Sequence, residues 1–401
     1  MYDGTFFDHF SKLEDEDYRQ DGKVRHKLIE LLFITVSAVI SGCNDWKEIS
    51  IWANAEINVK WLKKYIELLH GPPSLSTIKR LFNIIDPVQF EKHFVEWMEA
   101  VINLAEKDII SIDGKTMRGS QEKLTPKKAI HIVSALCKSN GLVLGQVKTD
   151  EKSNEITAIP ELLDLLYIEG CIVTIDAMGT QREIAEKIVN DNEAYYVLSL
   201  KGNQGNVHKE VEDYFNSLEE DDILQNLKND DKEVTTMTRK AQESGLMFFE
   251  TKEKGHGRIE TRTYYYSTNT DWMIDAKKDW PELNGIGMVD REIIINDEIT
   301  TERNFYIGSV DNIEDFSTAV RSHWGVESMH WSLDVTFRDD DNRTRKGNAP
   351  QNMAVLKRIA FNTVLADKEK HPKESKKSKR LLAQLDSDYR DYLLNLNFKD
   401  R

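Results

Sequence analysis

The chain has 401 residues, enough for two or three domains, and its 40% hydrophobic residues with eight Trp can fill a sizeable core. Its three cysteines form no CxxC pair, which argues against a zinc site and a disulfide framework and fits a reducing cytoplasm. The apolar run from Leu31 to Ile40 is too short to span a bilayer and the N-terminus lacks a basic n-region, so we expect no membrane or secretion signal.

Charge is unevenly distributed along the chain. The net charge of −15 does not favour nucleic-acid binding, because affinity for DNA comes largely from cations that neutralise phosphates. Residues 206–234, however, hold ten Asp/Glu against three Lys/Arg, whereas residues 342–380 hold twelve Lys/Arg against three Asp/Glu. The basic stretch is either a phosphate-binding surface or a solvated linker around residues 368–380.

Residues 1–105 are predicted to form a helical N-terminal domain. Residues 27–41 are apolar, and Pro72-Pro73 breaks the chain before a segment over 75–85 with helical apolar spacing and Ser74 as its N-cap. Its pattern fits either a helix that reads DNA or ordinary amphipathic packing. The N-terminal domain is therefore predicted either to bind DNA ends or to be a packed helical domain without that role.

From residue 108 the apolar pattern changes from helical to strand-like. The predicted elements are strands over 108–113, 129–137 and 142–148 with a hairpin turn at Asn140-Gly141, a helix after Pro160, a strand over 171–176, a helix over 181–190 and a strand over 194–200. The order β-β-β-α-β-α-β predicts an α/β fold with an RNase H-like catalytic core, that is, a mixed sheet with flanking helices.

The α/β alternation stops after Lys201. An acidic stretch leads into strand-like runs over 247–251, 258–267, 285–296 and 302–308, and a helix begins near Phe316. We predict that 206–310 is an acidic, then β-rich insertion that lies outside the catalytic sheet. The expected domains are thus 1–105, a catalytic domain from 106–205 and 311–366, the insertion 206–310, and a basic C-terminal tail 367–401.

Acidic residues at two strand ends are the first candidates for chemistry. Asp113 closes one apolar strand and Asp176 another, and in the predicted sheet these strands are neighbours, so both carboxylates should emerge at the same edge. A third carboxylate is expected from the following helix. At helical spacing one face of that helix carries His323, Trp324, Glu327, His330, Trp331 and Asp334.

The two classes of residue on this helical face call for different readings. Trp324 and Trp331 are expected to pack on the sheet, whereas Glu327 and Asp334 need a cation partner, because buried carboxylates are otherwise costly. Hard carboxylate oxygens favour Mg²⁺ or Mn²⁺. Zinc is disfavoured, because His323 and His330 form no HExxH motif with Glu327.

Five spaced motifs carry a resemblance to a known family. They are residues 113–120 (DGKTMRGS), 174–181 (TIDAMGTQ), 200–204 (LKGNQ), 256–262 (HGRIETR) and 323–335 (HWGVESMHWSLDV). In this order, over about residues 27–362, they resemble the signature blocks of bacterial insertion-sequence DDE transposases, in the branch that includes the H-repeat-associated proteins. Many relatives carry Arg and Lys where this chain has His323 and Asp334, so Asp334 either assists metal binding or orients a basic residue.

The resemblance implies metal-dependent cleavage at insertion-sequence ends and strand transfer into target DNA. It implies Asp113, Asp176 and Glu327 as the triad, holding two Mg²⁺ ions for which Mn²⁺ may substitute, and double-stranded DNA as the partner of a homodimer in the synaptic complex. Candidate DNA-binding residues are Lys115, Arg118, Lys201, Arg258, Arg262, Arg343, Arg345 and Lys346. The alternatives are an RNase H-like nuclease without joining activity and a domesticated DNA-binding protein.

Overall fold

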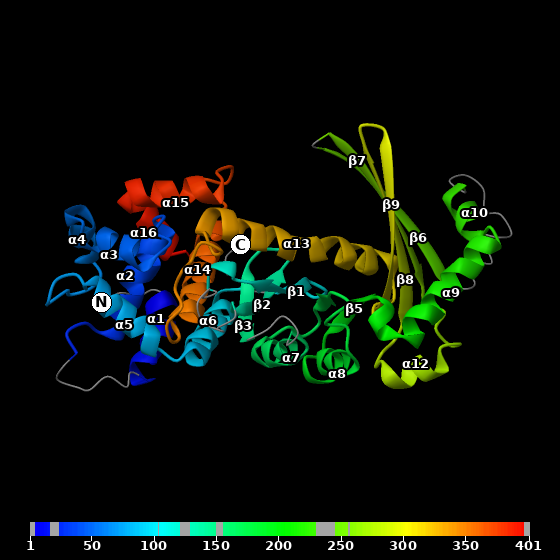
Figure 1. Cartoon of the computed structure of the whole chain (residues 1–401), viewed down its shortest axis with the longest axis horizontal. Coiled ribbons are helices and arrows are strands. Elements are labelled where there is room, and N and C mark those ends of the chain that lie inside the picture. The colour runs from blue at the N-terminus through cyan, green and yellow to red at the C-terminus, as the bar shows by residue number, and fades with distance from the viewer. Residues whose placement is uncertain are drawn as a thin grey trace. The chain divides into compact units, whose positions relative to one another are not determined.

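The computed structural model describes residues 5–16, 24–102, 104–120, 129–149, 155–229, 245–255 and 257–396. It divides into two compact units, the first made of 1–104, 114–167 and 325–401, the second of 105–113 and 168–324. Strand β1 (Ile109–Thr116) and helix α13 (Ile313–Phe337) each continue from one unit into the other (Figure 1). His256 of the fourth motif, residues 230–234 of the acidic stretch and residues 397–401 of the tail lie outside the described residues.

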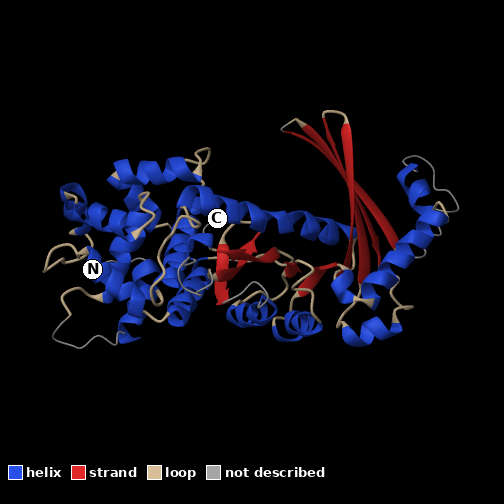
Figure 2. Cartoon of the chain, in the orientation of Figure 1, coloured by secondary structure: helices blue, strands red, loops and turns tan. Residues whose placement is uncertain are grey.

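The first unit is mainly helical and contains one antiparallel strand pair (Figure 2). Its N-terminal helices are α1 (Thr5–Phe10), η1 (Ser11–Glu16), α2 (Leu28–Ile40), α3 (Trp46–Asn54), α4 (Glu56–Leu62), α5 (Leu75–Ile84) and α6 (Pro87–Val101). Then come η2 (Arg118–Ser120), β2 (His131–Cys137), β3 (Val143–Thr149), α7 (Glu155–Leu165), the second half of α13, α14 (Ala349–Ala366), α15 (Lys376–Leu385) and α16 (Ser387–Leu394). In the described residues, no helix is both long and apolar enough to cross a membrane.

Helices α2 and α14 form the centre of the first unit. Every residue of α2 is buried, which explains its unbroken apolar sequence, and α14 packs against it. Two asparagines fix α14 to its neighbours: Asn352 donates to the Phe82 carbonyl of α5 (2.9 Å), and Asn362 bonds both backbone groups of Val143 on β3. These bonds satisfy backbone groups at the ends of elements, where buried polar atoms would otherwise be costly.

Several local expectations for the first unit are confirmed. Helix α5 begins after the N-cap Ser74, and Gly141 adopts a positive φ of 75° in the turn between β2 and β3. Helix α7, however, begins at Glu155, so Pro160 lies inside it instead of preceding it. The proline removes one helical hydrogen bond, and the buried face of Ala158, Leu162 and their neighbours offsets that loss.

The reading of residues 368–380 as a solvated linker fits residues 368–375, which form no helix or strand and are mostly exposed, but it is wrong for residues 376–380. Helix α15 begins at Lys376, and the side chains of Lys379 and Arg380 are buried. The Arg380 guanidinium donates to the carbonyls of Val39 (2.8 Å) and Cys43 (3.0 Å) and thereby closes the C-terminal end of α2. An arginine at this position donates hydrogen bonds to the last carbonyls of the helix, and its positive charge interacts favourably with the negative end of the helix dipole.

The second unit is built on a mixed sheet with the strand order β1-β4-β5-β9-β8-β7-β6. Its strands are β4 (Ile172–Ile175), β5 (Tyr195–Leu200), β6 (Leu246–Gly255), β7 (Arg258–Ser267), β8 (Gly285–Ile295) and β9 (Glu298–Gly308). Its helices are α8 (Arg182–Glu186), η4 (Lys187–Asp191), η5 (Gly202–Gln204), α9 (Asn206–Glu220), α10 (Ile223–Asn229), α12 (Ile274–Asp279) and the first half of α13. The pairings β1–β4 and β4–β5 are parallel, and those from β5 onward are antiparallel.

The expectation that the insertion lies outside the catalytic sheet is wrong. Strand β9 pairs with β5 through Val197↔Gly308 to Leu200↔Phe305, so β6–β9 continue the sheet as long twisted strands (Figure 2). A side chain at Gly287 of β8 would overlap the ring of Phe316, which also stacks on Tyr266 at 4.6 Å. This close packing fixes the beginning of α13 on the extended sheet.

A buried carboxyl group on α6 gives the first testable prediction. Glu91 is 3% exposed, and burial raises its pKa to about 8 even though its Oε1 accepts a hydrogen bond from the Gln146 N–H at 2.9 Å. Because the pKa in the fold lies above the ordinary value, the native state loses stability as pH rises through about 8.

We therefore expect Glu91→Gln to stabilise the protein at pH 8 by on the order of 1–3 kcal/mol and to have little effect at pH 5. Urea denaturation at both pH values measures this difference. Glu99→Gln, on the exposed side of the same helix, is the matched control and should change neither value. Equal effects of Glu91→Gln at the two pH values would contradict the assignment.

Candidate active site

Two of the predicted carboxylates lie on strands that run side by side: Asp176 directly follows β4, as expected, whereas Asp113 lies inside β1, which continues to Thr116. The parallel register pairs Ile112 of β1 with Ile175 of β4, so Asp113 and Asp176 occupy the next position on each strand. Both side chains are partly exposed. The alternation of side chains along a strand also puts them on the sheet face that carries Ser111 and Thr174. Two carboxylates at one level of one sheet face form a candidate cation site.

The turn after β4 fixes one oxygen of Asp176. Its Oδ1 accepts hydrogen bonds from the N–H groups of Met178 (3.1 Å) and Gly179 (3.2 Å). Asn203 and Gln204 of η5 both donate to the Ala177 carbonyl, at 2.7 and 2.6 Å. The Gly-rich segment 201–205 therefore positions the Asp176 turn, a role that a loop following the neighbouring parallel strand could have suggested.

Helix α13 contacts the same sheet face two residues before each carboxylate. His323 Nδ1 lies 3.0 Å from Thr174 Oγ1, and Ser111 Oγ donates to the Ser322 carbonyl at 3.4 Å. Thr174 and Ser111 also bond one another at 3.3 Å. His323 is thus a helix-to-sheet contact beside the candidate site.

Glu327 follows His323 by one helical turn on α13, and its side chain is exposed. The expectation that the two tryptophans pack on the sheet is wrong for Trp331, which is 65% exposed. Trp324 is 43% exposed, and its ring lies 4.7 Å from the guanidinium of Arg291 on β8. The buried ridge of α13 instead runs through Val326, Met329, Leu333 and Phe337, which are spaced for a single helical stripe and leave the tryptophans beside it.

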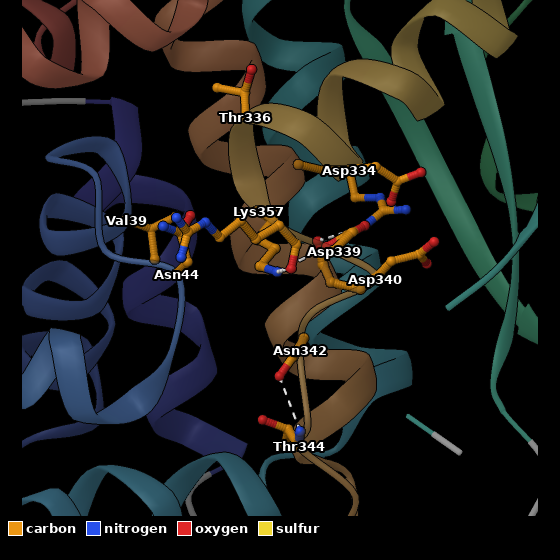
Figure 3. Close-up of polar contacts among 12 residues, drawn as sticks. Val39, Asn44, Asp334, Thr336, Asp339, Asp340, Asn342, Thr344 and Lys357 are labelled. Atoms are coloured by element: carbon orange, nitrogen blue, oxygen red, sulfur yellow. Dashed lines mark hydrogen bonds and ion pairs between the residues drawn. The ribbon is translucent and has the colours of Figure 1, made fainter. Parts of the chain in front are cut away.

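In the first unit Asp334 is an ion-pair partner of Lys115. The Lys115 side chain is buried and its ammonium contacts the carboxylates of Asp334 and, at 3.5 Å, Asp340 (Figure 3 shows both carboxylates). Asp340 also accepts a hydrogen bond from the Arg118 N–H at 3.2 Å, while the Arg118 side chain is exposed. Lys115 therefore connects the strand that begins at Ile109 to the later turns of α13.

A fully buried charge cluster closes the end of α13. The Asp339 carboxylate contacts Lys357 at 3.1 Å and Arg358 at 3.0 Å, and all three side chains are buried (Figure 3). Burial opposes the charged form of Asp339, but the two cations outweigh it and lower its pKa to about 2. Such a cluster is weak evidence for stability, yet losing one member would leave a buried charge unpaired.

The predicted DNA-binding residues of the second unit differ in exposure. Lys201 is exposed after β5, and Arg258 is partly exposed while contacting Glu260 at 3.2 Å. Arg262 is 6% exposed and pairs with Glu260 and Glu253 on the extended sheet. Little of the Arg262 side chain is therefore accessible to DNA.

The remaining predicted cations lie on the loop between α13 and α14. Arg343, Arg345 and Lys346 line a hollow of about 640 Å³ in the first unit. Across the described residues, no group of three or more His, Cys, Asp or Glu side chains lies close enough to hold a metal ion. The described residues thus pair Asp113 with Asp176 in register but do not gather them with Glu327 into a metal-binding group.

Comparison with known proteins identifies the family. Residues 104–363 match the family model described as "Transposase DDE domain", and residues 7–98 match the one described as "DDE_Tnp_1-associated". The chain belongs to the DDE transposase family. The motif residues, the carboxylates Asp113 and Asp176, and Glu327 all fall within the matched transposase domain.

Individual relatives agree with this assignment. The chain is 42% identical over 351 residues to the "Putative transposase YncI" of Escherichia coli O157:H7, covering 86% of this chain and 84% of the relative. It is 39% identical to the "H repeat-associated putative transposase YhhI" of Escherichia coli (strain K12), covering 88% of each. The chain is thus an insertion-sequence DNA transposase of the H-repeat-associated branch. A structure titled as a piggyBac transposase synaptic complex with hairpin DNA resembles it with a TM-score of 0.41 at 10% identity, over 98% of this chain and 80% of that one.

The Lys115–Asp334 pair yields a prediction for the transposase. Asp334→Asn removes the nearer carboxylate of Lys115, and Lys115→Gln removes the shared cation. If the pair acts as a unit, each substitution should slow cleavage of an element-end duplex by about 10-fold, and the double variant should be no slower than either single variant. Single-turnover cleavage at saturating DNA measures the coupling, with Asp341→Asn as the control on an exposed neighbour. Multiplicative losses in the double variant would show that the two residues act separately.

Proposed function

We propose that Asp113, Asp176 and Glu327 are the catalytic carboxylates of an RNase H-like core and bind two Mg²⁺ ions, which Mn²⁺ can replace. The observation that carries the proposal is the parallel register Ile112↔Ile175, which brings Asp113 and Asp176 to one level of one sheet face. The strand order β1-β4-β5 and the helices between these strands support the core assignment.

The donor groups fit a hard divalent cation. Carboxylate oxygens are the ligands that Mg²⁺ and Mn²⁺ prefer, and the turn after β4 fixes one oxygen of Asp176, while no described residue forms a hydrogen bond with the other. When bound, a metal pair activates the attacking water or 3′-OH and stabilises the leaving 3′ oxygen. The chain's own part is to hold the carboxylates rigidly, through the Ala177 contacts of η5 and the helix-to-sheet bonds of Thr174.

Glu327 is assigned as the third carboxylate from its place on α13. His323 contacts Thr174 in the strand that leads to Asp176, and Glu327 lies four residues later on the same unbroken helix. Residues four apart on a helix share a face, so the exposed Glu327 side chain projects from the face that carries His323. Asp334, seven residues further along, is paired with Lys115 and takes the role of orienting that lysine.

The DNA partners follow from the same proposal. Arg118, Lys201 and Arg258 have accessible side chains and are the candidates for holding phosphates near the carboxylates, whereas Lys115 and Arg262 act through their ion pairs. An element has two ends, so two copies of the chain, each supplying one triad, would act together on one synaptic complex in the cytoplasm.

Alanine substitution of the triad tests the proposal. Asp113→Ala, Asp176→Ala and Glu327→Ala should each reduce Mg²⁺-dependent nicking and joining of a labelled element-end duplex by at least about 10³-fold, because each removes a ligand needed in the transition state. DNA binding should persist, and stability should hold or rise, because removing one carboxylate relieves repulsion in the metal-free protein.

The matched control is Glu314→Ala, an exposed carboxylate on the same helix as Glu327. It should cleave and join at the wild-type rate. Measuring joining separately from nicking also separates a transposase from a nuclease that only hydrolyses DNA. Wild-type rates in Glu327→Ala, with Asp334 or Glu302 proving indispensable, would overturn the triad assignment.

A further inference from the structure

The first unit contains a hollow of about 640 Å³ whose walls come from two distant parts of the sequence. Lys47 in the first turn of α3 and Lys79 on α5 belong to the N-terminal helices. Arg343, Arg345 and Lys346 belong to the loop that follows α13. We call this hollow the basic groove. The sequence does not show these cations as one group, because Lys79 and Arg343 stand 264 positions apart.

The positive charge of the basic groove is not neutralised by its own walls. Five cations face two carboxylates, those of Asp45 and Asp341. Asp45 Oδ1 is already used as the N-cap of α3, where it accepts from the N–H groups of Lys47 (2.8 Å) and Glu48 (2.9 Å). Within the described part of the chain, Lys47, Lys79, Arg343 and Lys346 make no ion pair. Clustered cations in a concave surface attract and concentrate polyanions.

The loop that supplies three of these cations is docked, so its charges are held in place. Asn348 donates to the Ile85 carbonyl at 3.0 Å, and Gly347, with a φ of 53°, packs on the backbone of Asn83. Asn342 Oδ1 accepts from the Thr344 N–H at 3.1 Å and forms a local turn (Figure 3). A cation that is already positioned loses less conformational entropy on binding a ligand than one on a free tail.

We propose that the basic groove binds the sugar-phosphate backbone of double-stranded DNA and holds the duplex by charge, without reading its sequence. The groove is open and larger than one phosphate group, and its cations come from three separate segments, which suits a run of phosphates better than a single anion. The proposal rests on the proposed function for the presence of DNA. It gives the N-terminal helices a role in DNA binding that requires no recognition helix.

Neutralising the basic groove tests this role. The variant combines Lys47→Gln, Lys79→Gln, Arg343→Gln and Lys346→Gln, all at exposed positions. Fluorescence anisotropy is measured from low to high salt on an element-end duplex and on a scrambled duplex. The log–log salt slope should become shallower by about 0.9 for each lost contact, and affinity should fall by a similar factor on both duplexes.

A control variant carries the same loss of charge elsewhere, through Lys60→Gln, Lys63→Gln, Lys277→Gln and Lys278→Gln, which are exposed and lie outside the groove. It should keep the wild-type slope. A wild-type slope in the groove variant, or an equal change in both variants, would overturn the proposal. The proposal would also be overturned if the groove variant lost binding of an acidic peptide or of single-stranded RNA while its binding of the duplex stayed unchanged.

The catalytic assay separates this proposal from the proposed function. The groove variant should need a higher duplex concentration to reach half of its maximal cleavage rate, and it should still cleave, because its carboxylates are intact. Glu327→Ala should bind DNA with the wild-type salt slope and fail to cleave. If the groove variant keeps the wild-type salt slope while the triad variants abolish cleavage, the proposal for the basic groove is refuted and the proposed function is not.

Discussion

Ionised carboxylates on adjacent parallel strands repel one another, and the pairing of β1 with β4 is the constraint that would hold the proposed ligands Asp113 and Asp176 in register. The parallel pairing of β1 with β4 fixes the register of Asp113 and Asp176. A shift of one strand by one residue would turn one of the two side chains to the other face of the sheet. The Ala177 carbonyl receives two side-chain donors from η5, which fixes the turn after β4. The repulsion that remains is what a divalent cation would neutralise.

Each unit fixes the part of α13 that it contains. In the second unit, Phe316 packs against Gly287 and His323 contacts Thr174, so the beginning of the helix follows the sheet. In the first unit, Lys115 pairs with Asp334, and Arg380 donates to the Thr336 carbonyl. If Glu327 is the third carboxylate, as proposed, α13 gains precision from such contacts, since small displacements of a metal ligand weaken catalysis. Substitutions far from Glu327 should therefore affect the reaction rate.

Local patterns in the sequence were enough to predict the strands, the helix α5 with its cap, and the position of Asp176 directly after β4, whereas β1 continues past Asp113 to Thr116. Each of these depends on a short run of residues, such as the apolar strand before Asp176. The sequence could not predict that β9 pairs with β5, that Lys115 pairs with Asp334, or that Arg380 closes α2, because these contacts join distant segments. Net charge was also a poor guide to DNA binding, because the cations of the basic groove gather only in the folded chain.

The most direct test of the central claim, that Asp176 binds the metal, is a substitution that changes which metal ions this position prefers. Asp176→Cys replaces a hard oxygen by a softer sulfur, which binds Mg²⁺ poorly and Mn²⁺ or Cd²⁺ better. The account predicts that this variant loses at least about 10²-fold in cleavage rate with Mg²⁺ and recovers a large part of that loss with Mn²⁺ or Cd²⁺, because the altered atom is a ligand. Wild-type cleavage by Asp176→Cys in Mg²⁺ alone would contradict the claim that Asp176 binds the metal.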